Sequence, residues 1–196
     1  MAIFGEKFYK NLGELSPWQQ SLFALVLAHR QSPNFLLYAE MNEDTAAQND
    51  FMHVLDTMWE YHMDKDNHID LESLLEQLER HIPEIEDDTP YGAYPALDTC
   101  ISLSMSINAI INHFGDEAEQ ACGASICTVA KYLEITDDTL YSDEELYEKQ
   151  LIVEEMDFQI ELLNTISKAK RSLDFITKMK DECAGFEFSN IGISRY

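Results

Sequence analysis

Two pairs of acidic residues have the spacing that metal ligands take on a helix. Glu145 and Glu148 are separated by three positions, and so are Glu154 and Asp157. Carboxylates at that spacing lie on one helix face, where they can share a divalent cation and, through it, bind a phosphate group. Such chemistry would suit a metal-dependent hydrolase of a phosphorylated small molecule or nucleotide. The corresponding candidate acidic site comprises Glu154, Asp157 and Glu161.

The spacing between the two pairs argues against a shared cation. The pairs are similar to the acidic motifs of all-helical, magnesium-dependent nucleotide pyrophosphohydrolases, but only five residues separate them here. Glu145 and Glu154 are therefore about half a turn out of phase on one helix. The pairs converge only if that helix breaks or another chain contributes. A solvated acidic face explains the same residues, so we predict no metal and no other cofactor.

The segment Asp64–Asp70 alternates acidic or polar residues in the manner of a calcium-binding loop. Such a loop needs glycine at its sixth position and a bidentate glutamate at its twelfth. Ile69 and Leu75 stand at these two positions. We therefore expect a solvated connection between helices in place of a calcium site.

Histidine and cysteine spacing gives no stronger metal signal. A di-iron bundle needs two Glu-x-x-His pairs on facing helices, and only Asp50 with His53 comes close. Cys122 and Cys127 are five residues apart, so on a helix they point about 140° away from each other. Core cysteines and ordinary surface histidines are the expectation.

A loop before an apolar helix is the remaining candidate for a site. The sequence has no nucleophile elbow, phosphate-binding loop or dinucleotide fingerprint, and Ser125 has no base that spacing can identify. Residues 91–95 lead to Asp98, which we expect in the first turn of a helix, where free backbone N–H groups favour an anion. Such a residue is more often a structural carboxylate that fixes the helix start than a catalytic one, and we expect Asp98 to be at least partly buried with its carboxylate bonded to backbone N–H groups or hydroxyls. The candidate pocket comprises Trp18, Tyr91, Tyr94, Asp98 and Asn190.

The elements that would hold these residues are predicted to be helices throughout. Apolar residues recur at steps of three and four, and alternating strand-like runs are almost absent. The fold class predicted is an all-α, single-domain helical bundle spanning residues 1–196. The expected segments are 4–12, 18–29, a short helix near 35–38, 45–62, 70–82, a central buried helix at 96–114, and 118–135. From Ser142 to about Cys183 we expect one long C-terminal helix or two joined ones, followed by a docked tail at 185–196.

Local signals set several of these boundaries. Ser16 and Pro17 predict an N-cap and a first turn, and Ser32 with Pro33 predicts the end of the same helix. Thr45 is the expected cap of the next helix. The stretch 93–114 is apolar enough to suggest a membrane span, but its six Asp, Ser and Asn residues favour a buried helix.

Charge excludes one class of partner and suggests another. The net charge is -24, and residues 39–90 hold 16 acids against two bases. Such a surface repels nucleic-acid phosphates, so nucleic-acid binding is not expected. It can attract a basic protein partner, although solubility alone explains it as well. Four scattered cysteines and the lack of a signal-peptide pattern near the first residue predict a reduced protein in the cytoplasm, away from membranes.

Several segments together resemble the YjaG-like family of bacterial proteins, whose function is not established. They are 16–20 (SPWQQ), 28–34 (AHRQSPN), 54–60 (VLDTMWE), 91–98 (YGAYPALD), 128–130 (TVA), 142–146 (SDEEL), 155–159 (EMDFQ) and 189–193 (SNIGI). They cover nearly the whole chain in order. The resemblance implies a compact helical fold and brings no catalytic residue with it.

The sequence therefore favours a binding, interaction or regulatory module over an enzyme. The metal-dependent hydrolase stays open as the alternative. We also expect a homodimer, because the final apolar segment has more apolar positions than a short bundle easily covers.

Overall fold

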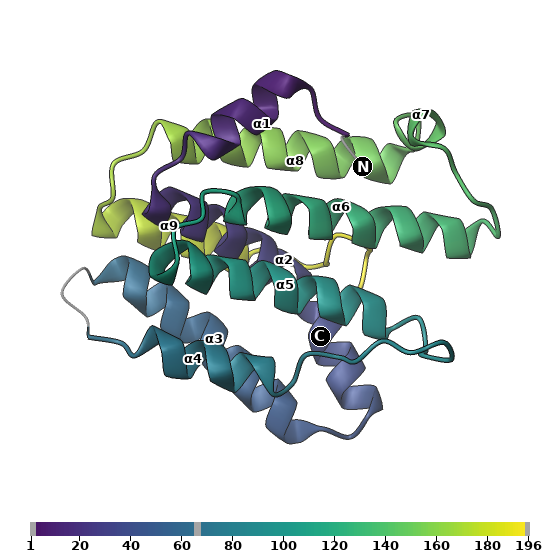
Figure 1. Ribbon diagram of the computed structural model, residues 1–196, viewed down its shortest axis with the longest axis horizontal. Coiled ribbons are helices and arrows are strands. Elements are labelled where there is room, and N and C mark those ends of the chain that lie inside the picture. The colour runs from purple at the N-terminus through teal and green to yellow at the C-terminus, as the bar shows by residue number, and fades with distance from the viewer. Residues whose placement is uncertain (1–2, 65–67, 195–196) are drawn as a thin grey trace.

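The computed structural model describes residues 3–64 and 68–194 and builds that part of the chain from nine helices (Figure 1). Within it the only strand-like pairing is an isolated antiparallel bridge between Phe188 and Ser194. The all-α prediction is confirmed. In chain order the helices are α1 (Glu6–Gly13), α2 (Pro17–Met41), α3 (Thr45–Met63), α4 (Leu71–Glu79), α5 (Ala93–Ile111), α6 (Glu117–Thr136), α7 (Asp143–Leu146), α8 (Gln150–Ser167) and α9 (Leu173–Ala184).

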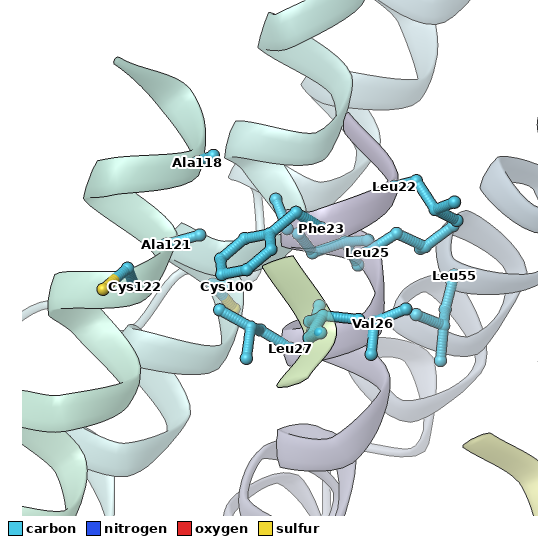
Figure 2. Close-up of a cluster of buried hydrophobic side chains, with 14 of the residues drawn as sticks. Leu22, Phe23, Leu25, Val26, Leu27, Leu55, Cys100, Ala118, Ala121 and Cys122 are labelled. Atoms are coloured by element: carbon cyan, nitrogen blue, oxygen red, sulfur yellow. The ribbon is translucent and has the colours of Figure 1, made fainter. Parts of the chain in front are cut away.

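Helix α2 runs through the middle of the bundle. It packs against α3, α5, α6, α8 and α9, and its segment 22–28 is almost completely buried. Figure 2 shows Phe23 of this segment pointing toward Cys100 of α5 and Ala121 of α6. The predicted central helix, α5, lies beside α2 and is also largely buried. The core therefore has two central helices, because both are apolar around most of their circumference.

The predicted end of α2 at Ser32 and Pro33 is wrong. The helix continues through Pro33 to Met41 without a break. Proline has no N–H to donate to the carbonyl four residues earlier, which belongs to His29. The Ser32 hydroxyl donates to that carbonyl at 2.8 Å. A side chain thus replaces the backbone hydrogen bond that Pro33 cannot make, and dense packing holds the helix together.

Two other predicted boundaries also need correction. Asp44, and not Thr45, caps α3, because its side chain accepts from the backbone N–H of Ala47 at 2.9 Å. Helix α5 begins at Ala93 and ends at Ile111, so it is displaced by three residues from the predicted 96–114. The predicted cap at Ser16 is confirmed, since its backbone N–H donates to the Gln19 side chain at 3.0 Å.

The predicted long C-terminal helix is wrong, because the final apolar segment forms three separate helices, α7, α8 and α9. The short α7 ends at Leu146, so Ser142 does not open a continuous helix. Between α8 and α9, Arg171 donates to the carbonyl oxygen of Tyr61, at the C-terminus of α3, with an N···O distance of 2.6 Å. Ser172 then caps α9. These contacts redirect the chain, so α9 packs on α2 and α3 while α8 packs on α2 and α6.

The cysteines and the apolar helices match the expectations for the described residues. Residues 3–64 and 68–194 contain all four cysteines and no disulfide, and burial raises the pKa of Cys100 and Cys122. No helix within residues 3–64 and 68–194 combines the length and the apolar character needed to span a bilayer.

Candidate functional site

Asp98 lies in the second turn of α5, because that helix begins earlier than predicted. Only 7% of it is exposed, and its Oδ2 accepts from the Thr128 hydroxyl at 2.7 Å. Its predicted burial and hydroxyl partner are confirmed, whereas its predicted place among the free backbone N–H groups of the first turn is wrong. Burial raises the pKa of Asp98, and the Thr128 hydrogen bond and nearby Lys131 oppose that rise.

The predicted pocket residues divide between two ends of the bundle. Tyr91 and Tyr94 precede Asp98, and burial raises the pKa of Tyr91, with a further contribution from the Asp98 charge. Asn190 binds α6 at Ser125, one turn before the residue that contacts Asp98. Trp18 lies near the start of α2, about 24 Å along that helix from Asn34, the α2 partner of Asn190. The structure therefore brings four of the five residues to one region and leaves Trp18 outside it.

The candidate acidic residues Glu154, Asp157 and Glu161 lie on one exposed face of α8. Glu145 does not join them, because its carboxylate accepts from the Ser142 backbone N–H at 2.8 Å and caps α7. In the part of the chain that the structure describes, no three His, Cys, Asp or Glu side chains lie close enough to bind one metal ion. The hydrolase alternative requires acidic side chains that converge on one cation, and the described residues contain no such group.

The calcium-like segment lies partly outside the described residues, since 65–67 belong to the gap. Asp70, at its end, caps α4 by accepting from the Ser73 backbone N–H at 3.1 Å. The other partial metal pattern, Asp50 with His53, is also not a pair. The Asp50 carboxylate contacts His81 and Gln77.

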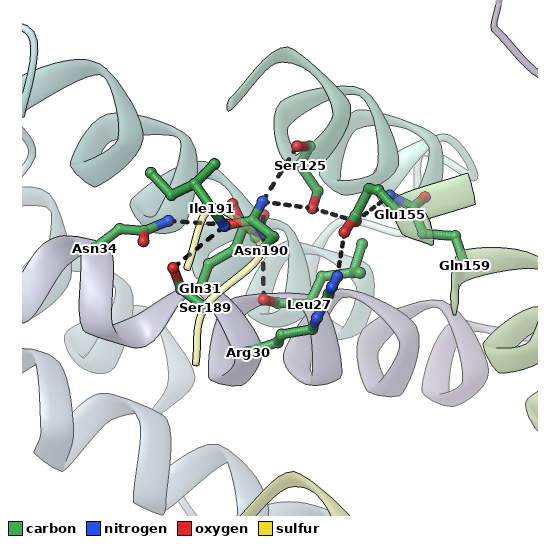
Figure 3. A network of polar contacts seen from close by, with 11 residues as sticks. Leu27, Arg30, Gln31, Asn34, Ser125, Glu155, Gln159, Ser189, Asn190 and Ile191 are labelled. Atoms are coloured by element: carbon green, nitrogen blue, oxygen red, sulfur yellow. Dashed lines mark hydrogen bonds and ion pairs between the residues drawn. The ribbon is translucent and has the colours of Figure 1, made fainter. Parts of the chain in front are cut away.

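A buried polar network joins α2, α6 and α8 (Figure 3), and the sequence did not predict it. Glu155 of α8 is 1% exposed and forms an ion pair with Arg30 of α2. Its other oxygen, Oε1, accepts from the Ser125 hydroxyl at 2.6 Å and from the Gln159 amide at 2.8 Å. A buried carboxylate is retained when its charge and lone pairs are matched in this way.

This network sets the rotation of α8. Apolar residues at steps of three and four predict that Val153, Met156 and Ile160 share the buried face of this helix, but these side chains are half-buried or exposed. The neighbouring positions, among them Glu155 and Gln159, face the interior instead. Helix α8 is therefore turned about its axis by about one residue relative to the orientation that hydrophobicity alone predicts. The sequence contains one signal for this rotation that was missed. Glu155 and Gln159 are four residues apart and lie on the same helix face as Ile152 and Leu162.

The C-terminal tail closes the network from the other side. The Asn190 amide donates to the Ser125 hydroxyl and to the Ser125 carbonyl, both at 3.2 Å, and its Oδ1 accepts from the Asn34 amide at 3.1 Å. A tight turn presents Asn190, with the Ser189 backbone N–H donating to the Ile193 carbonyl at 2.9 Å. Gly192 in that turn has a φ of +79°, a conformation that glycine adopts most readily. Ser125 thus connects the tail to the ion pair.

A groove of about 540 Å³ lies between α8 and α9, beside this network. Its apolar lining comprises Val26, Phe158, Leu162, Met179, Cys183 and Phe186. The Arg30 guanidinium lies 4.3 Å from the centre of the Phe158 ring, and Phe158 meets Phe186 edge-on with 5.8 Å between ring centres. Arg30 therefore contacts Glu155 in the network and an aromatic wall of the groove at the same time.

Two carboxylates line the groove from opposite helices, Glu161 on α8 and Glu182 on α9. Both residues are exposed. Lys178 lies 3.5 Å from Glu182, but both side chains are more than half exposed, so this pair is screened by solvent and contributes little. The groove thus combines an apolar lining with acidic edges.

Comparisons with known proteins agree with this fold. The chain is 34% identical over 189 residues to an uncharacterised protein of Haemophilus influenzae, covering 94% of this chain and 95% of that one. It is 32% identical over 188 residues to the uncharacterised protein YjaG of Escherichia coli, covering 93% and 94%. The crystal structure of a DUF416 family protein from Shewanella baltica superposes with a TM-score of 0.82 at 28% identity, covering 97% and 99%.

The family profile described as "Protein of unknown function (DUF416)" matches residues 7–194. The resemblance to YjaG-like proteins is therefore confirmed over nearly the full length, and the chain belongs to the DUF416 family.

Proposed function

We propose that this protein is an interaction module whose groove between α8 and α9 binds a basic, amphipathic segment of a partner protein. The observation that carries the proposal is the make-up of the groove, which has an apolar lining and a carboxylate on each helix. Amphipathic helices bind such grooves through apolar residues at steps of three and four. The carboxylates favour lysine or arginine on the polar face of the partner.

The dimensions of the groove suit a short helical segment. On the α8 side its lining extends from Phe158 to Thr165, which corresponds to about two turns or 10 Å. The half-buried Phe158 and Phe186 supply aromatic contact area, and the buried Met179 and Cys183 form a polarisable base beneath them.

The charge of the whole molecule supports a basic partner over a second copy. With a net charge of -24, two identical copies repel each other, whereas a cationic segment is attracted and its association is accelerated. The expected homodimer was based on an uncovered apolar stripe, and part of that stripe is buried within this chain, at Leu163, Ile166, Ile176 and Met179. Homodimerisation stays a prediction, which light scattering tests.

The test uses a synthetic helical peptide with leucines on one face and lysines on the other, measured by fluorescence anisotropy with the full chain. A scrambled peptide of identical composition retains the charge but loses the apolar face. We expect the ordered peptide to bind at least tenfold more tightly, which corresponds to about 1.4 kcal/mol. Equal binding of the two peptides would mean that non-specific attraction explains the result, and the groove would have no special role.

Charge reversal locates the binding surface. Glu161→Arg places a cation at the groove, and Glu154→Arg makes the same change two turns away on the same exposed face of α8. Both residues are exposed, so both variants should fold. We expect Glu161→Arg to weaken peptide binding about tenfold and Glu154→Arg to weaken it by less than threefold, since exposed charges are screened with distance. Equal effects at the two positions would contradict binding in the groove.

A further inference from the structure

A second pocket lies where α2 ends, α3 begins and the chain leaves α4. Its volume is about 270 Å³, and it is more polar than the groove. Phe35 and Ala39 of α2 and Ala47 of α3, all at most 4% exposed, give it an apolar base. Residues 80–84, which follow α4, line another side. The pocket is therefore formed by the adjacent ends of α2 and α3 and by a third segment farther along the chain, and it is separate from the groove between α8 and α9.

One lining residue, His81, is held in a fixed orientation. Its Nε2 donates to Asp50 Oδ2 at 2.7 Å, because an ionised carboxylate can only accept. The other Asp50 oxygen accepts from the Gln77 amide at 2.8 Å, and these hydrogen bonds lower the pKa of Asp50. The imidazole is only 16% exposed. A histidine ordered by a carboxylate at the edge of a pocket is a preorganised polar group.

Three other lining residues carry charges that form no salt bridge within the described residues, although the Arg80 charge helps to lower the pKa of Asp50. Arg80, Asp44 and Glu84 all line the pocket, and within residues 3–64 and 68–194 none of them forms an ion pair with an oppositely charged side chain. Arg80 is also one of only two bases among 16 acids in residues 39–90. Charges of both signs are thus available to a ligand within one small pocket.

From this arrangement we propose that the pocket binds a small zwitterion with a carboxylate and an ammonium group, of the class of free α-amino acids. Arg80 binds the carboxylate, and Asp44 and Glu84 bind the ammonium group beside the ordered ring of His81. A simple anion is repelled by the acidic surroundings, and a simple cation meets Arg80, whereas a zwitterion has no net charge. The volume equals that of about nine waters at ~30 Å³ each, which suits a ligand of roughly ten non-hydrogen atoms.

The first test is a thermal-shift measurement on the full chain with each of the twenty common L-amino acids, followed by calorimetric titration of those that stabilise it. A ligand that binds only the folded state raises its melting temperature. Butyrate and butylamine serve as probes that carry one charge each. We expect at least one amino acid to raise the melting temperature, and both single-charge probes to leave it unchanged. The proposal is overturned if no amino acid shifts it, or if butyrate alone stabilises as well.

Matched variants then place the binding site. Arg80→Gln removes the cation at the pocket, and Glu79→Gln changes the preceding, exposed residue, which does not line it. A charge-assisted hydrogen bond contributes enough for Arg80→Gln to weaken binding of the selected amino acid about tenfold or more. Glu79→Gln should leave the affinity within twofold. Both substitutions are at surface positions, and the melting temperature of each free variant verifies its fold. Equal losses in both variants would rule out this pocket.

Discussion

Replacing Arg30 with alanine should destabilise the protein by leaving the buried charge of Glu155 without its counter-ion. Glu155 is 1% exposed and forms an ion pair with Arg30. Removal of one partner from a buried pair typically costs about 3–5 kcal/mol. Ser125 and Gln159 still donate to Glu155 Oε1, so we expect the lower part of that range, about 3 kcal/mol. The loss of the guanidinium from the Phe158 ring adds a smaller amount.

The assay is urea unfolding followed by circular dichroism, with linear extrapolation to water. The denaturant midpoint should fall while the slope stays the same, because the native fold is retained. For a chain of this size, 3 kcal/mol corresponds to a melting temperature about 6–12 °C lower. Lys180→Ala is the control, since its ion pair with Asp56, at 3.8 Å, is partly exposed and should contribute less than about 1 kcal/mol.

A double variant distinguishes a lost charge partner from lost packing. Arg30→Met with Glu155→Gln removes both charges and keeps much of the side-chain volume. Replacing a whole buried pair is often close to neutral, so the double variant should be more stable than Arg30→Met alone. A double variant no more stable than that single variant, or an Arg30→Ala cost below about 1 kcal/mol, would refute the electrostatic reasoning.

Four further measurements test other parts of the structure. His62 is 1% exposed, and burial lowers its pKa to about 3, whereas its pKa in the unfolded chain is near 6.5. Between these pH values the unfolded chain binds a proton at His62 that the folded chain does not bind. Stability should therefore fall by up to about 1.4 kcal/mol per pH unit below pH 6.5, and His62→Gln should remove this contribution in urea unfolding at a series of pH values. Asn190→Ala removes three hydrogen bonds and should cost about 1–3 kcal/mol, with hydrogen exchange accelerated first in the tail at 189–193. Exhaustive chelation should leave the melting temperature unchanged, because no metal is predicted to be needed for folding. Light scattering at moderate salt should detect the expected homodimer, and a mass of 22.6 kDa at high protein concentration would contradict it.

The helical class and most helix positions followed from local patterns. Steps of three and four between apolar residues depend only on helix geometry, which is the same wherever the helix packs. The cap at Ser16 was recognisable for a similar reason, since its partner Gln19 is three residues away. Pro33 shows the limit of local rules. Its cost was offset by a hydroxyl on α2 itself and by packing on all sides of that helix, which overrides an unfavourable local residue.

The candidate site was predicted only in part. Asp98 was singled out because an acid is favoured by the free N–H groups at the start of an apolar helix, yet its partner, Thr128, lies on another helix and was not identifiable. The network around Glu155 was missed because its members come from α2, α6, α8 and the tail. Trp18 and Asp98 do not lie in one pocket. Resemblance of separate segments to a family does not determine which of those segments pack together in the fold.

The sequence by itself determined the fold class, the acidic surface and the family, because periodicity, composition and similarity are properties of the chain read in order. Only the tertiary structure decided the rotation of α8, the closure of the Glu155 network by Asn190, and the groove between α8 and α9. Each of these depends on which distant helices meet. The physical reason is that a buried charge is stable only beside its partners, and Arg30 lies 125 residues from Glu155 along the chain.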